Sequence, residues 1–487
     1  MPYYVQLYKS TDLNSPPLSG QTNSSIVVFN ACLVDGYSGT VSITGITRAS
    51  QTATATVSAA DGLKLKTGQY LTISGANETE YNGTFLITVA STTTFTYTVS
   101  GTPATPATGT ISGTLKLPIT SITRGGAGNL TATLTMPQQN NTLVTGNYVT
   151  VSGCTSTGAA QYNGTFQITS TSNTTFTYQM ASDPGANATV TGASYYKAGL
   201  QWTRPYSAGT NSQTYKSAAT VGANSEAYSP KYLQVIDNAA TAGTGKECQI
   251  YGAEVMQADQ TGVLGRFPTT TQAANGLCFR KSITADATVR EWTVFGDEKT
   301  FTIVNNSGDT VPWLGMSFGY FISFKSGDEY NTYIAGTSTF NSGTSLVNGF
   351  FALGWLANTT VHAGLYICRS FSQAGSSISS ALCGISTSGV MTGGGPVLSG
   401  ANSTFISLPN PVNNGYYLQP LFVQDGTAAQ LRGRIPGWFS SLQGNLFVNY
   451  DTITNVVGLS GKTLTVLTVS YGGQLGAGFV DTFGPWT

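Results

Sequence analysis

An internal repeat near the N-terminus constrains the fold of this chain more strongly than any other feature of its sequence. The sequence YNGTF at Tyr81–Phe85 recurs at Tyr162–Phe166, and TFTY at Thr94–Tyr97 recurs at Thr175–Tyr178. In both cases the two segments are 81 residues apart. A fixed period of this kind indicates an array of similar supersecondary units. Duplication of such a unit is more typical of a protein that provides an extended surface than of a protein organised around a single active site.

Each copy alternates apolar and polar residues with a period of two. In the first copy, apolar side chains occupy every second position over 85–89 and again over 95–99, mostly with threonine between them. This period indicates strands with one buried face. The dipeptides Asn82-Gly83 and Asn163-Gly164 lie between strands, and they predict tight hairpin turns in which glycine adopts a positive φ.

The repeats divide the chain into four expected parts. Residues 43–118 and 119–193 are two small β modules, either immunoglobulin-like sandwiches or barrels. None of the six tryptophans precedes Trp202, and turn signals about every ten residues predict one larger antiparallel domain over 194–487. The expected fold class is all-β, with two tandem small β-sandwich or barrel repeats inserted in a larger antiparallel β domain.

The N-terminal segment, residues 1–42, is expected to pack with the C-terminal domain while the repeats project as an appendage. Residues 25–34 form a nearly continuous apolar run. Such a run is compatible with a buried strand or a short helix, and its length and β-branched residues favour the strand.

Composition argues for a folded β protein that carries little charge. Aromatic residues make up 11% of the chain, whereas disordered sequences contain few aromatic residues. Charged residues make up only 9%, with 21 basic and 21 acidic side chains. The sequence has no basic run of the kind that predicts nucleic-acid binding. It also has no apolar stretch long enough to predict a membrane span. The first residues lack the features of a secretory signal, so synthesis in a cytoplasm is expected.

Residues suited to catalysis or metal binding are sparse. His362 is the only histidine, and no serine near it lies in a nucleophile elbow. We therefore interpret it as a core or surface residue. The six cysteines are dispersed without metal-ligand spacing or a disulfide framework. Cys154 occupies the position of Ala76 in the first copy, which predicts a small buried side chain.

Carboxylates are the remaining candidates for catalytic or metal-binding residues. Asp297-Glu298 and Asp328-Glu329 are adjacent pairs, and Glu291 lies nearby in the sequence. We interpret them first as turn residues, with calcium ligands and the carboxylates of a glycosidase as alternatives. Lys66–Gly68 resembles a penicillin-binding element, but the second copy has valine in place of Lys66, so the lysine is taken as dispensable. Gly393–Pro396 lacks the Lys-Ser/Thr of a phosphate loop. No catalytic, metal or cofactor-binding residue is predicted.

Six segments with turn and aromatic residues carry a resemblance to known proteins: Leu18–Gly36, Gly199–Asn211, Trp292–Phe301, Phe318–Asp328, Leu431–Gly437 and Asp481–Trp486. They resemble uncharacterised structural proteins of tailed bacteriophages, in which small β repeats follow a short opening segment. The repeats alone resemble modules of phage tail and fibre proteins. The resemblance implies a virion location in the tail or neck, with no activity and no catalytic residues.

The expected function is a non-enzymatic structural component of a bacteriophage virion, in the tail, baseplate or neck. We expect a symmetric homo-oligomer, a trimer or hexamer, with other virion structural proteins as partners. One alternative is a host-receptor-binding fibre, adhesin or capsid decoration protein, in which aromatics such as Tyr195, Tyr196 and Trp202 stack on a host surface glycan. Another is a glycan-degrading spike. The sequence does not distinguish positions within the particle.

Overall fold

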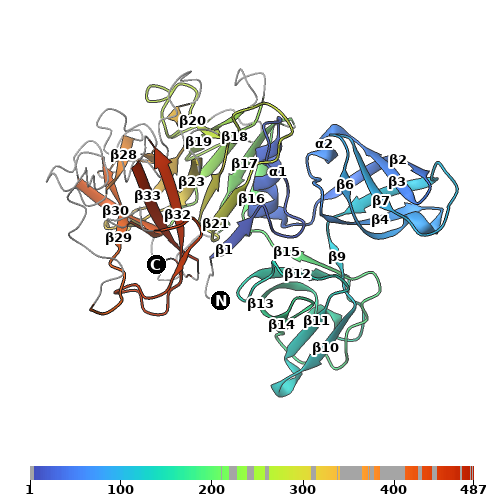
Figure 1. Ribbon diagram of the computed structural model, residues 1–487. Coiled ribbons are helices and arrows are strands. Elements are labelled where there is room, and N and C mark those ends of the chain that lie inside the picture. Colours follow the sequence, from blue (N-terminus) through green and yellow to red (C-terminus); the bar gives the residue numbers. More distant parts are fainter. Residues whose placement is uncertain are drawn as a thin grey trace. The chain divides into compact units, whose positions relative to one another are not determined.

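The computed structural model describes residues 5–209, 211–218, 228–238, 246–257, 263–308, 314–336, 338–339, 365–370, 372, 378–383, 412–425, 430–440, 447–471, 474–482, 484 and 486. Strands joined by turns provide nearly all of the regular structure (Figure 1), so the predicted all-β fold is confirmed. No helix in the described part of the chain combines the length and the apolar character needed to cross a membrane.

The chain divides into two compact units. The large unit comprises Met1–Leu7, Ser19–Ile26 and Trp202–Thr487, and the barrel unit comprises Tyr8–Leu18 and Val27–Gln201. Residues 1–42 therefore contribute to both units. The limits of independently folding domains that the sequence suggests, at 42, 118 and 193, stay predictions.

The first repeat forms a closed ring of antiparallel strands, drawn in blue in Figure 1. Its strands are β2 (Thr40–Ala49), β3 (Thr52–Val57), β4 (Tyr70–Ala76), β5 (Gly83–Leu86), β6 (Thr88–Val89), β7 (Thr94–Thr98) and β8 (Gly109–Thr114). They pair in the order β5-β4-β8-β2-β3-β7-β6. Because β5 and β6 are two pieces of one strand interrupted at Ile87, the ring closes into a six-stranded barrel. A closed barrel has no sheet edge to protect.

The second repeat forms the same ring. Its strands are β9 (Leu117–Pro118), β10 (Ser121–Gly125), β11 (Thr131–Thr135), β12 (Tyr148–Ser152), β13 (Gly164–Ser172), β14 (Thr175–Gln179) and β15 (Ser194–Lys197). They pair in the order β10-β11-β14-β13-β12-β15-β9. Here β9 and β10 are the interrupted strand. Both modules are thus barrels rather than immunoglobulin-like sandwiches, and strand pairing extends the second beyond residues 119–193 at both ends.

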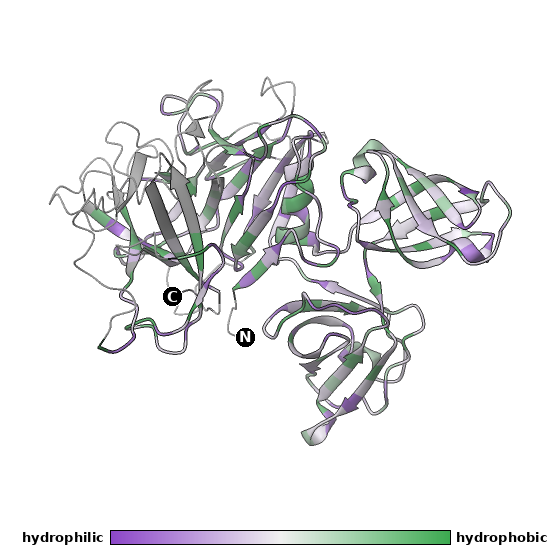
Figure 2. Ribbon diagram, viewed as in Figure 1, coloured by the Kyte–Doolittle hydropathy of each residue, from purple (hydrophilic) through white to green (hydrophobic). Residues whose placement is uncertain are grey.

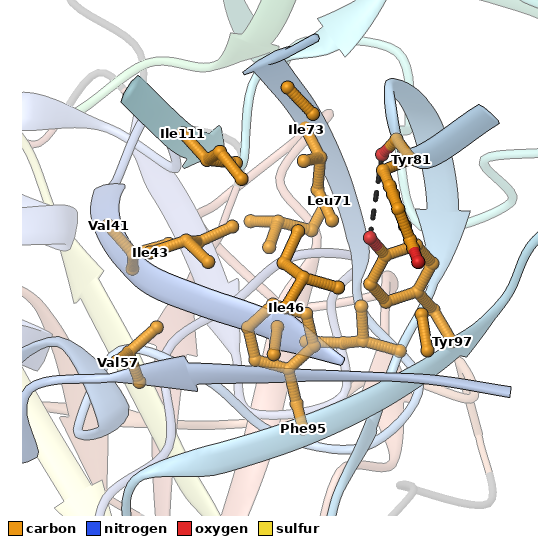
Figure 3. Close-up of a cluster of buried hydrophobic side chains, with 14 of the residues drawn as sticks. Val41, Ile43, Ile46, Val57, Leu71, Ile73, Tyr81, Phe95, Tyr97 and Ile111 are labelled. Atoms are coloured by element: carbon orange, nitrogen blue, oxygen red, sulfur yellow. Dashed lines mark hydrogen bonds between the residues drawn. The ribbon is translucent and has the colours of Figure 1, made fainter. Parts of the chain in front are cut away.

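The barrel interiors are filled by the alternate residues that the sequence pattern predicts to be buried. In β3, Ala53 and Ala55 are fully buried while the threonines between and beside them face outward. Figure 3 shows side chains from several strands, including Ile46, Leu71 and Phe95, converging inside the first barrel. Complete burial of a side chain such as Phe95 contributes about 1.5–3 kcal/mol. The outward threonines, serines and glycines give both barrels the pale colours of weak hydropathy in Figure 2.

The repeated YNGTF segment forms the same corner in both barrels. The Asn82 side chain exchanges hydrogen bonds of 3.0 and 2.7 Å with the backbone of Ala76, and Asn163 does so at 3.0 and 3.0 Å with Cys154. Cys154 is buried, as predicted from its position. The preceding tyrosine, Tyr81 or Tyr162, is also fully buried in both copies.

Gly83 and Gly164 have positive φ values of 143° and 148°, which confirms the predicted backbone conformation. The predicted tight hairpin turn is wrong. The connections contain short 3₁₀ helices, η2 (Thr79–Tyr81) and η4 (Ala159–Gln161), and each glycine begins the following strand. A ring, Phe85 or Phe166, lies over each glycine, with its Cζ 3.2 Å from where a Cβ would stand. The Asn-Gly pair therefore marks a capped corner and a close approach of an aromatic ring.

The large unit contains two antiparallel sheets. The six-stranded sheet runs β16 (Thr203–Ser207), β17 (Ser212–Lys216), β18 (Tyr232–Ile236), β19 (Glu247–Ala253), β20 (Leu277–Arg280) and β26 (Ser338–Thr339). The 13-stranded sheet runs β1 (Gln6–Lys9), β21 (Trp292–Gly296), β22 (Thr300–Asn305), β23 (Leu314–Tyr320), β25 (Thr332–Ala335), β27 (Leu365–Ile367), β28 (Ile378–Cys383), β29 (Gln419–Asp425), β30 (Gln430–Ser440), β33 (Gln474–Asp481), β32 (Leu464–Tyr471) and β31 (Thr452–Ile453), with β24 (Ile322–Ser323) paired to β30.

The threonine alternation in β22 does not mark a solvent-facing surface, contrary to the simplest interpretation of its period. All six residues of β22 are buried. Thr300 donates a 2.9 Å hydrogen bond to the carbonyl oxygen of Tyr320, and the hydroxyls of Thr302 and Ser317 are 2.8 Å apart. Both faces of this central strand are covered, so hydrogen bonds satisfy the hydroxyls that water cannot reach.

Helices are short and few in the described chain. The apolar run at 25–34, expected to be a strand, is instead the helix α1 (Ser24–Phe29) followed by the π helix η1 (Asn30–Asp35). Phe29, Cys32 and Leu33 are completely buried. A helix covered on several sides has the same continuous apolar sequence as a buried strand, which explains the error. The remaining helices are α2 (Ala59–Gly62) and η3 (Ala127–Asn129).

Candidate functional site

Asp297, the first acidic residue singled out from the sequence, caps the turn between β21 and β22. Its carboxylate accepts hydrogen bonds of 2.8 Å from the backbone N–H groups of both Lys299 and Thr300. Burial raises the pKa of Asp297, and these two hydrogen bonds oppose the rise. The interpretation as a turn residue is confirmed for Asp297, because its Oδ1 atom accepts both hydrogen bonds from the backbone of its own turn.

The same turn is tied to neighbouring parts of the large unit through its carbonyl groups. The indole Nε1 of Trp202 donates a 3.0 Å hydrogen bond to the carbonyl oxygen of Asp297, and the Ser217 hydroxyl donates to that of Glu298. Burial and the neighbouring Asp297 carboxylate raise the pKa of Glu298 to about 8. Glu298 therefore carries a proton over much of the neutral range, and its Oε1 atom is enclosed without a hydrogen-bond partner.

Asp328, the other acidic residue of interest, belongs to a buried ion pair that the sequence did not reveal. Arg432 in β30 donates hydrogen bonds of 2.8 and 3.0 Å to its two carboxylate oxygens. Ser323 and the backbone N–H of Tyr330 donate to the same carboxylate at 2.6 and 3.1 Å. The Arg432 side chain also donates a 3.0 Å hydrogen bond to the carbonyl oxygen of Arg369. The arrangement joins three chain segments and leaves the carboxylate saturated with donors.

The remaining candidates do not join these acids. Glu291 and Glu329 are exposed. In the described part of the chain, no three His, Cys, Asp or Glu side chains come together as a metal-binding set. His362 and Gly393–Pro396 lie outside the described residues.

The aromatic residues considered for sugar stacking are packed inside the protein, with one exception. Tyr195 and Trp202 are 0% and 2% exposed. The Trp202 ring meets that of Phe301 edge to face, with 5.3 Å between the centroids. Tyr196 is partly exposed, with the Lys116 ammonium 5.4 Å from the centre of its ring. Tyr195 and Trp202 thus have no surface to offer a glycan.

Two further buried ion pairs escaped the sequence analysis. In the barrel unit, the Lys197 ammonium lies 2.6 Å from the Asp12 carboxylate, which also accepts a hydrogen bond from the Tyr37 hydroxyl. In the large unit, Lys281 pairs with Asp237, whose carboxylate also accepts a 2.9 Å hydrogen bond from the backbone N–H of Ser25. Asp12 belongs to the N-terminal region itself, whereas Asp237 and Lys281 contact that region through hydrogen bonds with Ser25 and Gln21. Only their separation in sequence hid them, since no local motif marks either one.

Lys66 has a definite structural role, so the inference that it is dispensable is wrong. Its ammonium group donates hydrogen bonds to the carbonyl oxygen of Ser10 and to the hydroxyl of Ser15. The equivalent Val144 of the second barrel is 55% exposed. The two copies differ here because the N-terminal segment contacts them differently.

Comparison with known proteins identifies no relative of this chain. No family of known proteins matches the sequence, and no curated protein is detectably similar to it.

Proposed function

We propose that this chain is a non-enzymatic structural component of a tailed-bacteriophage virion, located in the tail, baseplate or neck. The proposal starts from the resemblance of its six turn-rich segments to phage structural proteins. The observation that supports it most is that the buried acidic side chains hold parts of the fold together. Asp297 holds a turn, and Asp12, Asp237 and Asp328 each pair with a buried cation that ties distant segments together.

A symmetric homo-oligomer, a trimer or a hexamer, is part of the proposal. Of the eleven large hydrophobic side chains that are exposed among the described residues, nine lie in the large unit and only Leu86 and Val144 lie in the barrel unit. Val412 and Val448 are 92% and 69% exposed. Interface cores are enriched in apolar groups and depleted in charge, so the large unit is the expected site of subunit contacts.

The alternative, a host-receptor-binding or capsid decoration protein, has less support. Tyr195 and Trp202, two of the three aromatics proposed to stack on a glycan, are buried. A glycan-degrading spike would require a pair of accessible carboxylates in one groove. Asp297 and Asp328 are buried and hydrogen-bonded, whereas Glu291 and Glu329 are exposed.

Electron microscopy of the virion, combined with light scattering of the purified protein, tests this proposal. We expect density for the two barrels and the large unit at a symmetric position in the tail, baseplate or neck, and a trimer or hexamer in solution. A monomer in solution together with single isolated copies in the particle would refute it. Incubation with host surface polysaccharide provides an independent test, because release of new reducing ends would identify a depolymerase.

A further inference from the structure

The six residues Ser10–Ser15, here called the strap, contact both barrels of the barrel unit. Asn14 is almost completely buried and faces the first barrel. Its Nδ2 donates hydrogen bonds of 2.9 and 2.6 Å to the carbonyl oxygens of Tyr70 and Leu115, and its Oδ1 accepts a 2.9 Å hydrogen bond from the N–H of Tyr70. The amide side chain thereby exchanges both hydrogen bonds with one backbone residue, as a paired strand does.

The residues just before Asn14 engage the second barrel. The Leu13 side chain packs against the core of the second barrel, and its N–H donates a 3.1 Å hydrogen bond to the Thr142 hydroxyl. Asp12 pairs with Lys197, which lies in β15 of the same barrel. Consecutive residues of the strap thus hold different barrels, and Asn14, where the contact changes from one to the other, has a positive φ of 60°.

Further side chains of the first barrel bond to the two ends of the strap. Lys66 donates to Ser10 and Ser15, and Gln69 Nε2 donates a 3.0 Å hydrogen bond to the carbonyl oxygen of Ser15. Burial lowers the pKa of Lys66 to about 8, and the Asp12 carboxylate acts against this lowering. The cost of burying this ammonium group is offset by hydrogen bonds that only the strap provides.

Two short segments join the first barrel covalently to the rest of the barrel unit. The chain enters the first barrel through Gly36–Gly39 and leaves it through Leu115–Lys116, and the N–H of Leu115 donates a 2.8 Å hydrogen bond to the carbonyl oxygen of Gly39. Two connections that lie side by side form a natural hinge. The Tyr70 side chain packs against the second barrel's core across this hinge, and the backbone of Tyr70 is held by Asn14.

We propose that the strap is a lock that fixes the two barrels as one rigid pair, and that its release lets the first barrel rotate about the hinge formed by Gly36–Gly39 and Leu115–Lys116. In the locked state the distance and angle between the two barrels are fixed. A fixed arrangement allows both barrels to contact one partner at the same time. The lock is independent of the role in a virion, because it depends only on contacts within this chain.

Distance measurement by electron paramagnetic resonance tests the lock in the full-length protein. Thr54→Cys and Thr133→Cys place spin labels on outward positions of equivalent strands, and a protein without these substitutions, treated with the same reagent, gives the background labelling. We expect one narrow distance distribution in the labelled protein. In the Asn14→Gly/Lys66→Met variant the distribution should broaden and shift. Lys64→Met is the matched control, since Lys64 bonds to Asp61 and Thr40 rather than to the strap.

Two outcomes would overturn the lock. One is a broad distribution in the protein with an intact strap, and the other is an unchanged narrow distribution in the double variant. If circular dichroism shows that the double variant does not fold, Asn14→Gly alone replaces it. Glycine accepts the left-handed backbone at this position while removing all three side-chain hydrogen bonds. An unchanged distribution in that folded variant would equally refute the proposal.

Discussion

Replacement of Arg432 by methionine tests how much the buried ion pair with Asp328 contributes to the stability of the large unit. The side chains of Arg432 and Asp328 are 0% and 1% exposed, and two hydrogen bonds of 2.8 and 3.0 Å join them. Methionine fills much of the space of the arginine side chain without its charge. The carboxylate would keep its hydrogen bonds from Ser323 and from the backbone of Tyr330 but lose the charge that balances its own.

The expected loss is about 3–5 kcal/mol, the typical result of leaving one partner of a buried pair uncompensated. Most of this loss comes from keeping the Asp328 charge buried without the Arg432 cation, and less comes from the attraction within the pair. The double variant Arg432→Met/Asp328→Asn removes that charge, so it should be more stable than Arg432→Met alone. The two substitutions therefore should not be additive.

Urea denaturation of the full-length protein, followed by tryptophan fluorescence, measures these differences. Trp438 is a suitable reporter because it lies buried in β30, the strand that carries Arg432. Arg434→Met, at a partly exposed position of the same strand, is the matched control and should have a small effect. A loss below about 1 kcal/mol for Arg432→Met, as for exposed ion pairs, would refute the reasoning. Simple additivity in the double variant would also refute it.

Three further predictions concern the barrels and the turn after β21. Gly83→Val and Gly164→Val should each lower the free energy of unfolding by about 1–3 kcal/mol, because a branched residue is strained at positive φ and would displace the aromatic ring over the glycine. Gly45→Val is the control, because there is open space where its Cβ would stand, and equal stability of all three variants would contradict the prediction. Asn82→Ala and Asn163→Ala should cost similar amounts, about 1–3 kcal/mol each, because each leaves a backbone N–H without its partner; clearly unequal losses by thermal unfolding would argue against equivalent corners. The raised pKa of Glu298, about 8 against an ordinary 4.5, means that the folded protein retains a proton that the unfolded chain loses, so stability should fall as pH rises from 4.5 to 8. Glu298→Gln should remove this part of the pH dependence, whereas the exposed Glu329→Gln should leave it unchanged.

The sequence predicted the barrels well because their information is local. Period-two alternation identifies which residues face inward, as Ala53 and Ala55 do in β3. The Asn-Gly pairs predicted positive φ at Gly83 and Gly164 for a sound steric reason. The 3₁₀ helices that precede them, and the closure of each ring through an interrupted strand, depend on contacts between distant strands that no local pattern records.

The large unit was harder to predict because central strands such as β22 are buried on both faces. Thr300 and Thr302 have the alternation of a half-exposed strand, but hydrogen bonds to neighbouring strands allow them to lie in the interior. The ion pair between Asp328 and Arg432 spans 104 residues of sequence. The turn interpretation identified Asp328 as a structural residue, but it could not identify the partner that explains its burial.

Differences between the two copies of the repeat carry information that their similarities do not. The core and corner residues match because both barrels have the same strand order and bury side chains at the same positions. Lys66 and Val144 differ because the strap bonds to the first barrel at this position, whereas the equivalent position of the second barrel is open to solvent. Comparison of the copies alone suggested that Lys66 was unimportant. The structure shows instead that Lys66, which only the first copy has, lies where that copy contacts the strap.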